Sequence, residues 1–250
     1  MSGASRARIW LIQALSVAVI LGVWEIAARV HWVDPLFVPA PSAVARAFRT
    51  MGGSALQALA DTLVKTAIAY ALAVVFGVAS GVILGSVKPL RDVLNPFVIA
   101  VYGMPKILVL PWIVLLLGTG APPAVFYGTL HGLFPVLLFV IGGVRDVDPA
   151  LLTVARAFGA RPWQLYTRVI LPAIVPAVVA GMRLGIIFCL LGVLIVEMFA
   201  GVRGMGYQLG AFANGFQAPE LFAATLLVST VSIAIVLALD ALGDHLSRWR

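Results

Sequence analysis

The sequence has a single cysteine, Cys189, among its 250 residues. One cysteine excludes an intramolecular disulfide bond and a cysteine-based metal site. His31 and His131 are isolated, with no second histidine, cysteine or carboxylate four residues away, so we expect no metal site. No serine or other nucleophile stands with a base in a pattern that indicates catalysis, which argues against an enzyme.

Charged residues are scarce as well, at 11% of the chain against about 25% in soluble domains. Apolar residues make up 62%, and the mean hydropathy is +1.08. This composition excludes a soluble globular protein and indicates an integral membrane protein. Most of the net charge of +7 falls in short loops between apolar segments, so it reports membrane topology and not a nucleic-acid partner.

Lysine is rare, and this bears on nucleotide binding. The three lysines are Lys65, Lys88 and Lys106, and none of them follows a glycine. A phosphate-binding loop of the G-x-x-x-x-G-K-[ST] type requires a Gly-Lys pair, so the chain has no such loop. We therefore expect this chain to bind no cofactor, and any ATP-driven step to occur on a separate partner.

Six apolar segments are each long enough to cross about 30 Å of hydrocarbon as a helix. They comprise residues 9–28, 63–87, 93–117, 124–143, 174–199 and 221–242. The predicted fold class is all-α, a polytopic membrane protein with about six transmembrane helices. The loops are too short for a soluble domain. We divide the chain into residues 1–61, a first helix with an interfacial connection, and residues 62–250, the core.

Lysine and arginine are distributed unevenly across the membrane. Assigning alternate loops to alternate sides places ten on one side and four on the other. The ten are Arg6, Arg8, Lys88, Arg91, Arg145, Arg156, Arg161, Arg168, Arg248 and Arg250. The positive-inside bias then predicts that both termini are cytoplasmic, together with the loop between the fourth and fifth spans.

Small residues recur every four positions in the second span, at Gly77, Gly81 and Gly85. This spacing lets the backbones of two helices approach closely in a membrane. The pattern predicts a helix-packing face, and it fits contacts within one chain as well as contacts between two chains.

The third span contains three prolines, Pro96, Pro105 and Pro111. Each removes a backbone donor, so we expect this helix to be bent. Lys106 lies at the centre of this irregular stretch. Two interpretations stay open: a residue of the translocation pathway that attracts an anionic solute, or a lysine that snorkels or is paired inside the protein.

Two further charges lie in the fifth span. Arg183 is about two turns from its cytoplasmic end, where snorkelling competes with an ion pair near an inner gate. Glu197 is near the outer end, where solvation at the interface competes with a role at an outer gate or docking surface. With Lys106, these two are the candidate pathway residues.

The loop at residues 144–172 is the only long inward loop, and its sequence predicts two short helices. Asp148 is suited to cap a helix that begins at Pro149, and apolar residues follow at helical spacing. Those residues are Leu151, Ala155 and Phe158.

Gly159 is expected to end this first helix, and Arg161-Pro162 to begin a second. A structured amphipathic element at the membrane surface must bury its apolar side against its own spans, against lipid headgroups or in a groove of another protein.

The stretch from Thr153 to Pro172 resembles the EAA loop of binding-protein-dependent ABC importer permeases. Four residues match that pattern in register: Ala155, Gly159, Leu171 and Pro172. Thr153 stands where the family usually has glutamate, so an ion pair of that carboxylate is absent here or replaced by a weaker hydroxyl contact. The segments PAPSAVARAF, PKILVLPWIVLLLGTG, VEMFAG and PELFAATLLVS look like the sulfonate, taurine and nitrate branch, over about residues 36–240.

The resemblance implies a type I ABC importer permease in the bacterial cytoplasmic (inner) membrane. It implies a second copy of the permease, two ATPase subunits that carry ATP and Mg, and an extracytoplasmic substrate-binding protein. A small, anionic organic solute such as a sulfonate, or nitrate, would move inward by alternating access. The residues implied in ATPase coupling are Asp148, Leu151, Thr153, Ala155, Phe158, Gly159, Leu171 and Pro172.

A self-contained secondary transporter is the alternative. It would need internal repeats and coupling-ion carboxylates near the middle of the membrane. The sequence shows no persuasive repeat, and its few carboxylates avoid the span centres.

Overall fold

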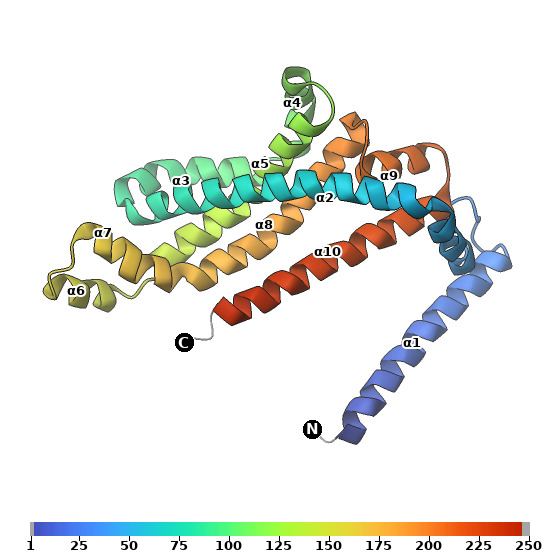
Figure 1. Ribbon diagram of the computed structural model, residues 1–250, viewed down its shortest axis with the longest axis horizontal. Helices are drawn as coiled ribbons and strands as arrows, with labels where there is room; N and C mark the ends of the chain where they lie inside the picture. The colour runs from blue at the N-terminus through green and yellow to red at the C-terminus, as the bar shows by residue number, and fades with distance from the viewer. Residues whose placement is uncertain (1–2, 247–250) are drawn as a thin grey trace.

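The computed structural model describes residues 3–246, and over that range the chain consists of helices and their connections (Figure 1). In chain order the elements are α1 Gly3–Arg29, α2 Pro41–Ser86, α3 Lys88–Gly103, η1 Lys106–Val109, α4 Leu110–Leu117, α5 Ala121–Arg145, α6 Pro149–Ala157, α7 Pro162–Leu165, η2 Tyr166–Ile170, α8 Leu171–Ala200, α9 Met205–Asn214 and α10 Ala218–Leu246. The all-α prediction is confirmed. Arg248 and Arg250, which entered the charge comparison, lie outside the described residues.

Within the described part of the chain, five helical segments are long and apolar enough to cross a membrane. They contain α1, α2, α5, α8 and α10, and the pair formed by α3 with η1 and α4 makes a sixth. The described residues therefore hold five candidate spans, or six if this bent pair is one span, which agrees with the prediction of about six. The third is broken, because the helix axis turns by 86° between residues 88–103 and residues 106–117.

The position of the break follows from Pro105. The preceding residue, Met104, has an extended backbone (φ −67°, ψ 137°), which is the conformation that a following proline favours. Pro96, by contrast, lies inside α3 without ending it. The bend predicted for this span is confirmed, and one of its three prolines determines where the helix stops.

The second span begins earlier than hydropathy indicates. Helix α2 starts at Pro41 and contains a kink at Gly52, whose φ of 40° and ψ of −125° are not helical. Residue 61 lies inside α2, so the boundary between residues 1–61 and 62–250 passes through a helix. That division stays a prediction.

Helices α2, α5 and α8 pack along one another, with α6 and α7 at one end and α9 at the other (Figure 1). We call the end that carries α6 and α7 the inner end and the opposite end the outer end. Helix α1 extends away from the bundle and meets the other helices near its C-terminal part (Figure 1). There the ring of Trp24 lies tilted against that of Phe222, with 5.9 Å between the ring centroids.

The glycine stripe of α2 packs against valines of α5. A Cβ atom added at Gly77 would lie 2.9 Å from the Cβ of Val136, and one added at Gly81 would lie 2.7 Å from that of Val140. At Gly85 the corresponding distance to Val144 is 2.6 Å. Only a hydrogen fits on the α2 backbone at these contacts, and the valines belong to the same chain. Of the two alternatives for this stripe, the contact within one chain is therefore confirmed.

Helix α8 approaches α5 just as closely. A Cβ at Gly192 would lie 2.9 Å from the Cα of Gly128, and one at Gly143 would lie 2.5 Å from the Cβ of Ala177. The last contact is two residues before the end of α5, directly beside the inner loop. The three helices therefore form one closely packed unit along their length.

We expect Gly81→Val to destabilise the protein, because its side chain would overlap Val140. Overpacking of this kind costs about 1–3 kcal/mol. The measurement is the midpoint of thermal unfolding in detergent. Gly22→Val in α1 is the matched control, since nothing lies within 4 Å of a Cβ built there. Equal midpoints for the two variants would contradict the packing described here.

Candidate functional site

The inner loop folds as its caps predict. Asp148 accepts a hydrogen bond from the backbone N–H of Ala150 over 2.8 Å, and Pro149 is the first residue of α6. Helix α6 ends at Ala157, and Gly159 follows with φ +77°. That left-handed conformation favours glycine at the C-terminal side of a helix. The predicted helix boundaries are confirmed.

The second helix of the loop is continuous with the fifth span. Helix α7 begins at Pro162 as predicted, and the π-helical turn η2, residues 166–170, joins it to α8. Leu171 and Pro172 are the first two residues of α8. The loop therefore leaves the end of α5 and enters α8 without a flexible linker at its C-terminal side.

One side of the loop is anchored to the bundle. Val147 and Ile170 are buried in a cluster with Val140 and Val144 of α5, and Leu152 packs against that cluster. The loop therefore has a fixed position relative to the inner ends of α5 and α8.

The other side of the loop presents apolar side chains to the surroundings. Phe158 is 89% exposed, and Leu151, Val154 and Trp163 are each more than half exposed. Leu151 and Phe158 were predicted to share one apolar face, and the structure leaves that face uncovered. Such a surface is suited to a groove on another protein or to lipid headgroups.

Thr153, which replaces the glutamate usual in the resembling family, is exposed and bonds to its own helix. Its hydroxyl donates to the carbonyl of Pro149 over 2.9 Å. Ala155 is half-buried on the same helix. Within this chain the hydroxyl of Thr153 makes a local contact, so it does not take the place of an ion pair between elements.

Lys106 lies at the break of the third span. Its ammonium donates to the carbonyl of Tyr102 over 2.9 Å and lies 5.0 Å from the ring centroid of Tyr102 and 5.4 Å from that of Phe134. The aromatic faces stabilise the cation electrostatically. No carboxylate of the described residues forms an ion pair with it. The charge is thus held in place but not neutralised.

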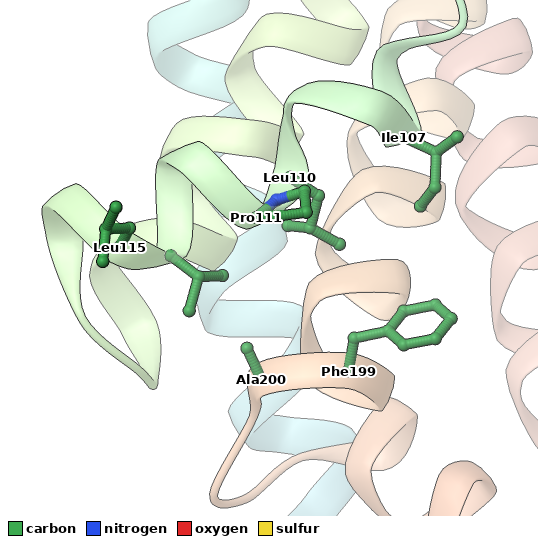
Figure 2. A pocket seen from close by; sticks show the side chains of 7 residues that line it. Ile107, Leu110, Pro111, Leu115, Phe199 and Ala200 are labelled. Carbon is green, nitrogen blue, oxygen red and sulfur yellow. The ribbon is translucent and has the colours of Figure 1, made fainter.

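Beside this break, an apolar cavity of about 520 Å³ separates α4 from the outer end of α8. Figure 2 shows side chains of α4 on one side of it, with Phe199 and Ala200 on the other. Its lining has no charged residue. This cavity offers no group that could bind an anion.

Arg183 forms an ion pair with Asp240 of α10. Both side chains are partly exposed. Arg183 thus has an ion pair, while its place near an inner gate stays a prediction. Asp240, which lies near the end of its span, is the partner that hydropathy alone does not identify.

Glu197 is buried, so of its two interpretations the one that has it solvated at the interface is wrong. Its side chain is fully covered, and Oε1 accepts a hydrogen bond from the Lys65 ammonium over 2.7 Å. Oε2 accepts from the hydroxyl of Thr62 over 2.7 Å and from the N–H of Gly206 over 2.9 Å. A carboxylate enclosed in this way is not open to a solute.

This cluster holds the first turn of α9. The N-cap residue, Gly204, has no side chain with which to cap the helix. Instead Glu197 accepts from Gly206 N–H, and the Thr62 hydroxyl accepts from Met205 N–H over 2.7 Å. A carboxylate at a helix N-terminus is favourable, and Lys65 compensates its charge. Residues of α2 and α8 thereby fix the outer loop and α9.

The structure does not bring Lys106, Arg183 and Glu197 together, since each has its own partners on different elements. Sequence reasoning missed Lys65 and Thr62. The signal that could have identified them is their spacing of three residues, which places both on one face of α2. Helix α9 was missed as well.

Comparison with known proteins agrees with this geometry. The family described as "Binding-protein-dependent transport system inner membrane component" matches residues 73–250. The taurine transport system permease protein TauC of Escherichia coli is 27% identical over 241 residues, covering 94% of this chain and 88% of the relative. The nitrate import permease protein NrtB of Synechocystis is 26% identical over 234 residues, covering 89% and 84%.

Among solved structures, the chain is similar to one from the MetNI methionine ABC transporter in an inward-facing conformation. The TM-score is 0.71 at 20% identity, and the match covers 79% of this chain and 98% of that one. The identity is low, so this likeness concerns the fold.

We expect Lys65→Met to be strongly destabilising, because it leaves the Glu197 carboxylate buried without its counter-charge. Breaking a buried pair in this way costs about 3–5 kcal/mol. The double variant Lys65→Met with Glu197→Gln should recover part of the loss, measured as the thermal unfolding midpoint in detergent.

Arg203→Met is the control for that experiment. This substitution removes the ion pair between Arg203 Nε and Asp61 Oδ2, which lie 3.6 Å apart. The Arg203 side chain is 71% exposed. Exposed pairs contribute at most about 1 kcal/mol. If Lys65→Met lowered the midpoint no more than Arg203→Met does, the buried pair would not have the role described.

Proposed function

The chain belongs to the family of binding-protein-dependent transport system inner membrane components and has the fold of an ABC importer permease, and from this premise we propose that it moves a small oxyanion-bearing solute inward. The family places the chain in the inner membrane as a multi-pass component, with an ATPase and a binding protein as partners in general. It also decides against the self-contained secondary transporter.

The observation that carries the mechanism is the exposed apolar face of α6. Phe158 and Leu151 lie uncovered on an element that is otherwise anchored to α5 and α8. We propose that an ATPase subunit receives this face in a groove. Two ATPase subunits would serve two copies of this chain, and ATP and Mg would bind to the ATPase pair. The loop residues from Asp148 to Pro172 would transmit the movement.

The transport cycle then follows from rigid connections. Closure of the ATPase pair would displace the two inner loops, and each loop would carry its own α5 and α8. Rocking of the two permease copies would open the path alternately to each side. We place both termini on the cytoplasmic side, as the distribution of lysine and arginine predicts, so the outer surface formed by α9 and its loops would face the binding protein.

The class of solute rests on chemistry and on the relatives. The relatives named above carry taurine, a sulfonate, and nitrate, according to their names. Both solutes present a compact group of oxygen atoms with negative charge. Lys106 supplies a partly buried cation without a carboxylate partner among the described residues. It lies at irregular backbone, which a membrane tolerates where that backbone is buried in protein or lines a pathway. This supports an oxyanion-bearing solute, and Lys106 as a pathway residue.

Phe158→Asp tests the coupling proposal. A carboxylate on the apolar face would have to be desolvated in the groove, so we expect the ATPase no longer to co-purify and uptake to fall by at least tenfold. The fold should be unaffected, because Phe158 is 89% exposed.

The matched control for co-purification of the ATPase is Phe216→Asp in the connection between α9 and α10, at the opposite end of the molecule (Figure 1). Phe216 is 63% exposed, so the substitution changes a comparable surface aromatic. Retention of the ATPase by the Phe158 variant, or its loss from both variants, would contradict docking on α6.

Lys106→Met tests the pathway proposal. Removing the cation should reduce uptake of nitrate or taurine by about tenfold or more, while Lys106→Arg retains part of the activity because it keeps the charge. Uptake by cells that produce the whole importer is the measurement. Lys88→Met, at the exposed start of α3, is the control. Unchanged uptake by Lys106→Met would exclude the cation from the pathway.

A further inference from the structure

A second cavity, of about 510 Å³, lies at the inner end of the bundle, beneath the loop at residues 144–172, which we call the coupling loop after the role proposed above. Three elements that are distant in sequence each contribute one arginine to its lining. They are Arg91 from α3, Arg145 from the end of α5 and Arg156 from α6. The cavity is therefore enclosed by the loop on one side and by the ends of the spans on the other.

Among the described residues, two of the three charges around this cavity have no counter-charge from the protein. None of the residues that line it is acidic. In the described part of the chain, neither Arg145 nor Arg156 forms an ion pair, and Arg91 has only Asp92 at 3.7 Å and the carbonyl of Gly85 at 3.1 Å. Three cations that converge on one cavity repel one another, so an anion bound between them would be favourable.

The acidic residues of the loop itself do not line this cavity. Asp146 and Asp148 line a separate cavity together with Ala173 and Pro176 of α8, and the Asp148 side chain caps α6. The arginines and the aspartates of the loop thus line two different cavities.

Ser86 also lines the arginine cavity, and its buried hydroxyl has no hydrogen-bond partner in the described structure.

The remaining lining indicates what kind of anion fits. Val144, Leu152, Leu165 and Ile170 give the cavity an apolar part beside the cationic one. The cavity also lies where the spans end on the side with more arginine and lysine. Cationic and apolar groups together, at the ends of apolar spans, match a lipid with an anionic phosphate headgroup.

We propose that this cavity is a binding site for the headgroup of an anionic phospholipid such as phosphatidylglycerol, with Arg145 and Arg156 as its principal ligands and Ser86 as an additional donor. The bound headgroup braces the coupling loop against α2, α3 and α5. Lipid composition then affects how firmly the loop is held, independently of which solute the importer carries.

Native mass spectrometry of the purified chain in detergent tests the site, with phosphatidylglycerol, phosphatidylcholine and inorganic phosphate as separate probes. We expect phosphatidylglycerol to be retained at least tenfold more tightly than the zwitterionic lipid. Equal retention of the two lipids would overturn the proposal. Inorganic phosphate that binds as tightly as phosphatidylglycerol would overturn the assignment to a lipid.

Substitutions then locate the site. Arg145→Gln and Arg156→Gln should each weaken binding of phosphatidylglycerol about fivefold, and the double variant about 25-fold. Both side chains are exposed enough that the fold should tolerate the change. Arg168→Gln is the control, because Arg168 belongs to the same loop and is exposed but does not line the cavity. An equal loss in the control would reduce the effect to general surface charge and overturn the site.

Discussion

The structure depends on the close approach of three helices, α2, α5 and α8, at contacts where only glycine fits. Gly77, Gly81 and Gly85 of α2 receive valines of α5, and Gly143 of α5 lies against Ala177 of α8. In a membrane, where lipid provides no hydrophobic drive for helices to associate, this packing supplies much of the attraction. Because the coupling loop connects α5 directly to α8, the loop is part of the same unit and not an appendage to it.

The two ends of this unit are fixed by different means. At the outer end a buried ion pair, Lys65 with Glu197, holds the first turn of α9 and the preceding loop. At the inner end apolar residues such as Ile170 bind the loop to α5, and unpaired arginines remain around a cavity. The outer end is thus held by a buried polar cluster, and the inner end by apolar contacts that leave Phe158 and Leu151 exposed.

The sequence alone predicts the features that depend on neighbouring residues. Apolar length identifies the candidate spans, and Asp148, Pro149 and Gly159 mark the helices of the loop. It does not predict features that require distant residues to meet. The pairing of Glu197 with Lys65, and of Arg183 with Asp240, joins different helices. Pro105 indicates a break, but the angle of 86° depends on what α4 packs against. Helix α9 is capped by other helices, so its own sequence carries little signal.

The most direct test of the account asks whether the coupling loop and the bundle move as one body. Spin labels at Thr167→Cys on η2 and Leu56→Cys on α2 report the distance within one copy of the chain, and both sites are exposed. Cys189 is buried and does not compete for the label. In the assembled importer we predict that this distance is the same with and without trapped ATP, while the distance between the Thr167 labels of the two copies changes. A change within one copy as large as the change between copies would contradict the account.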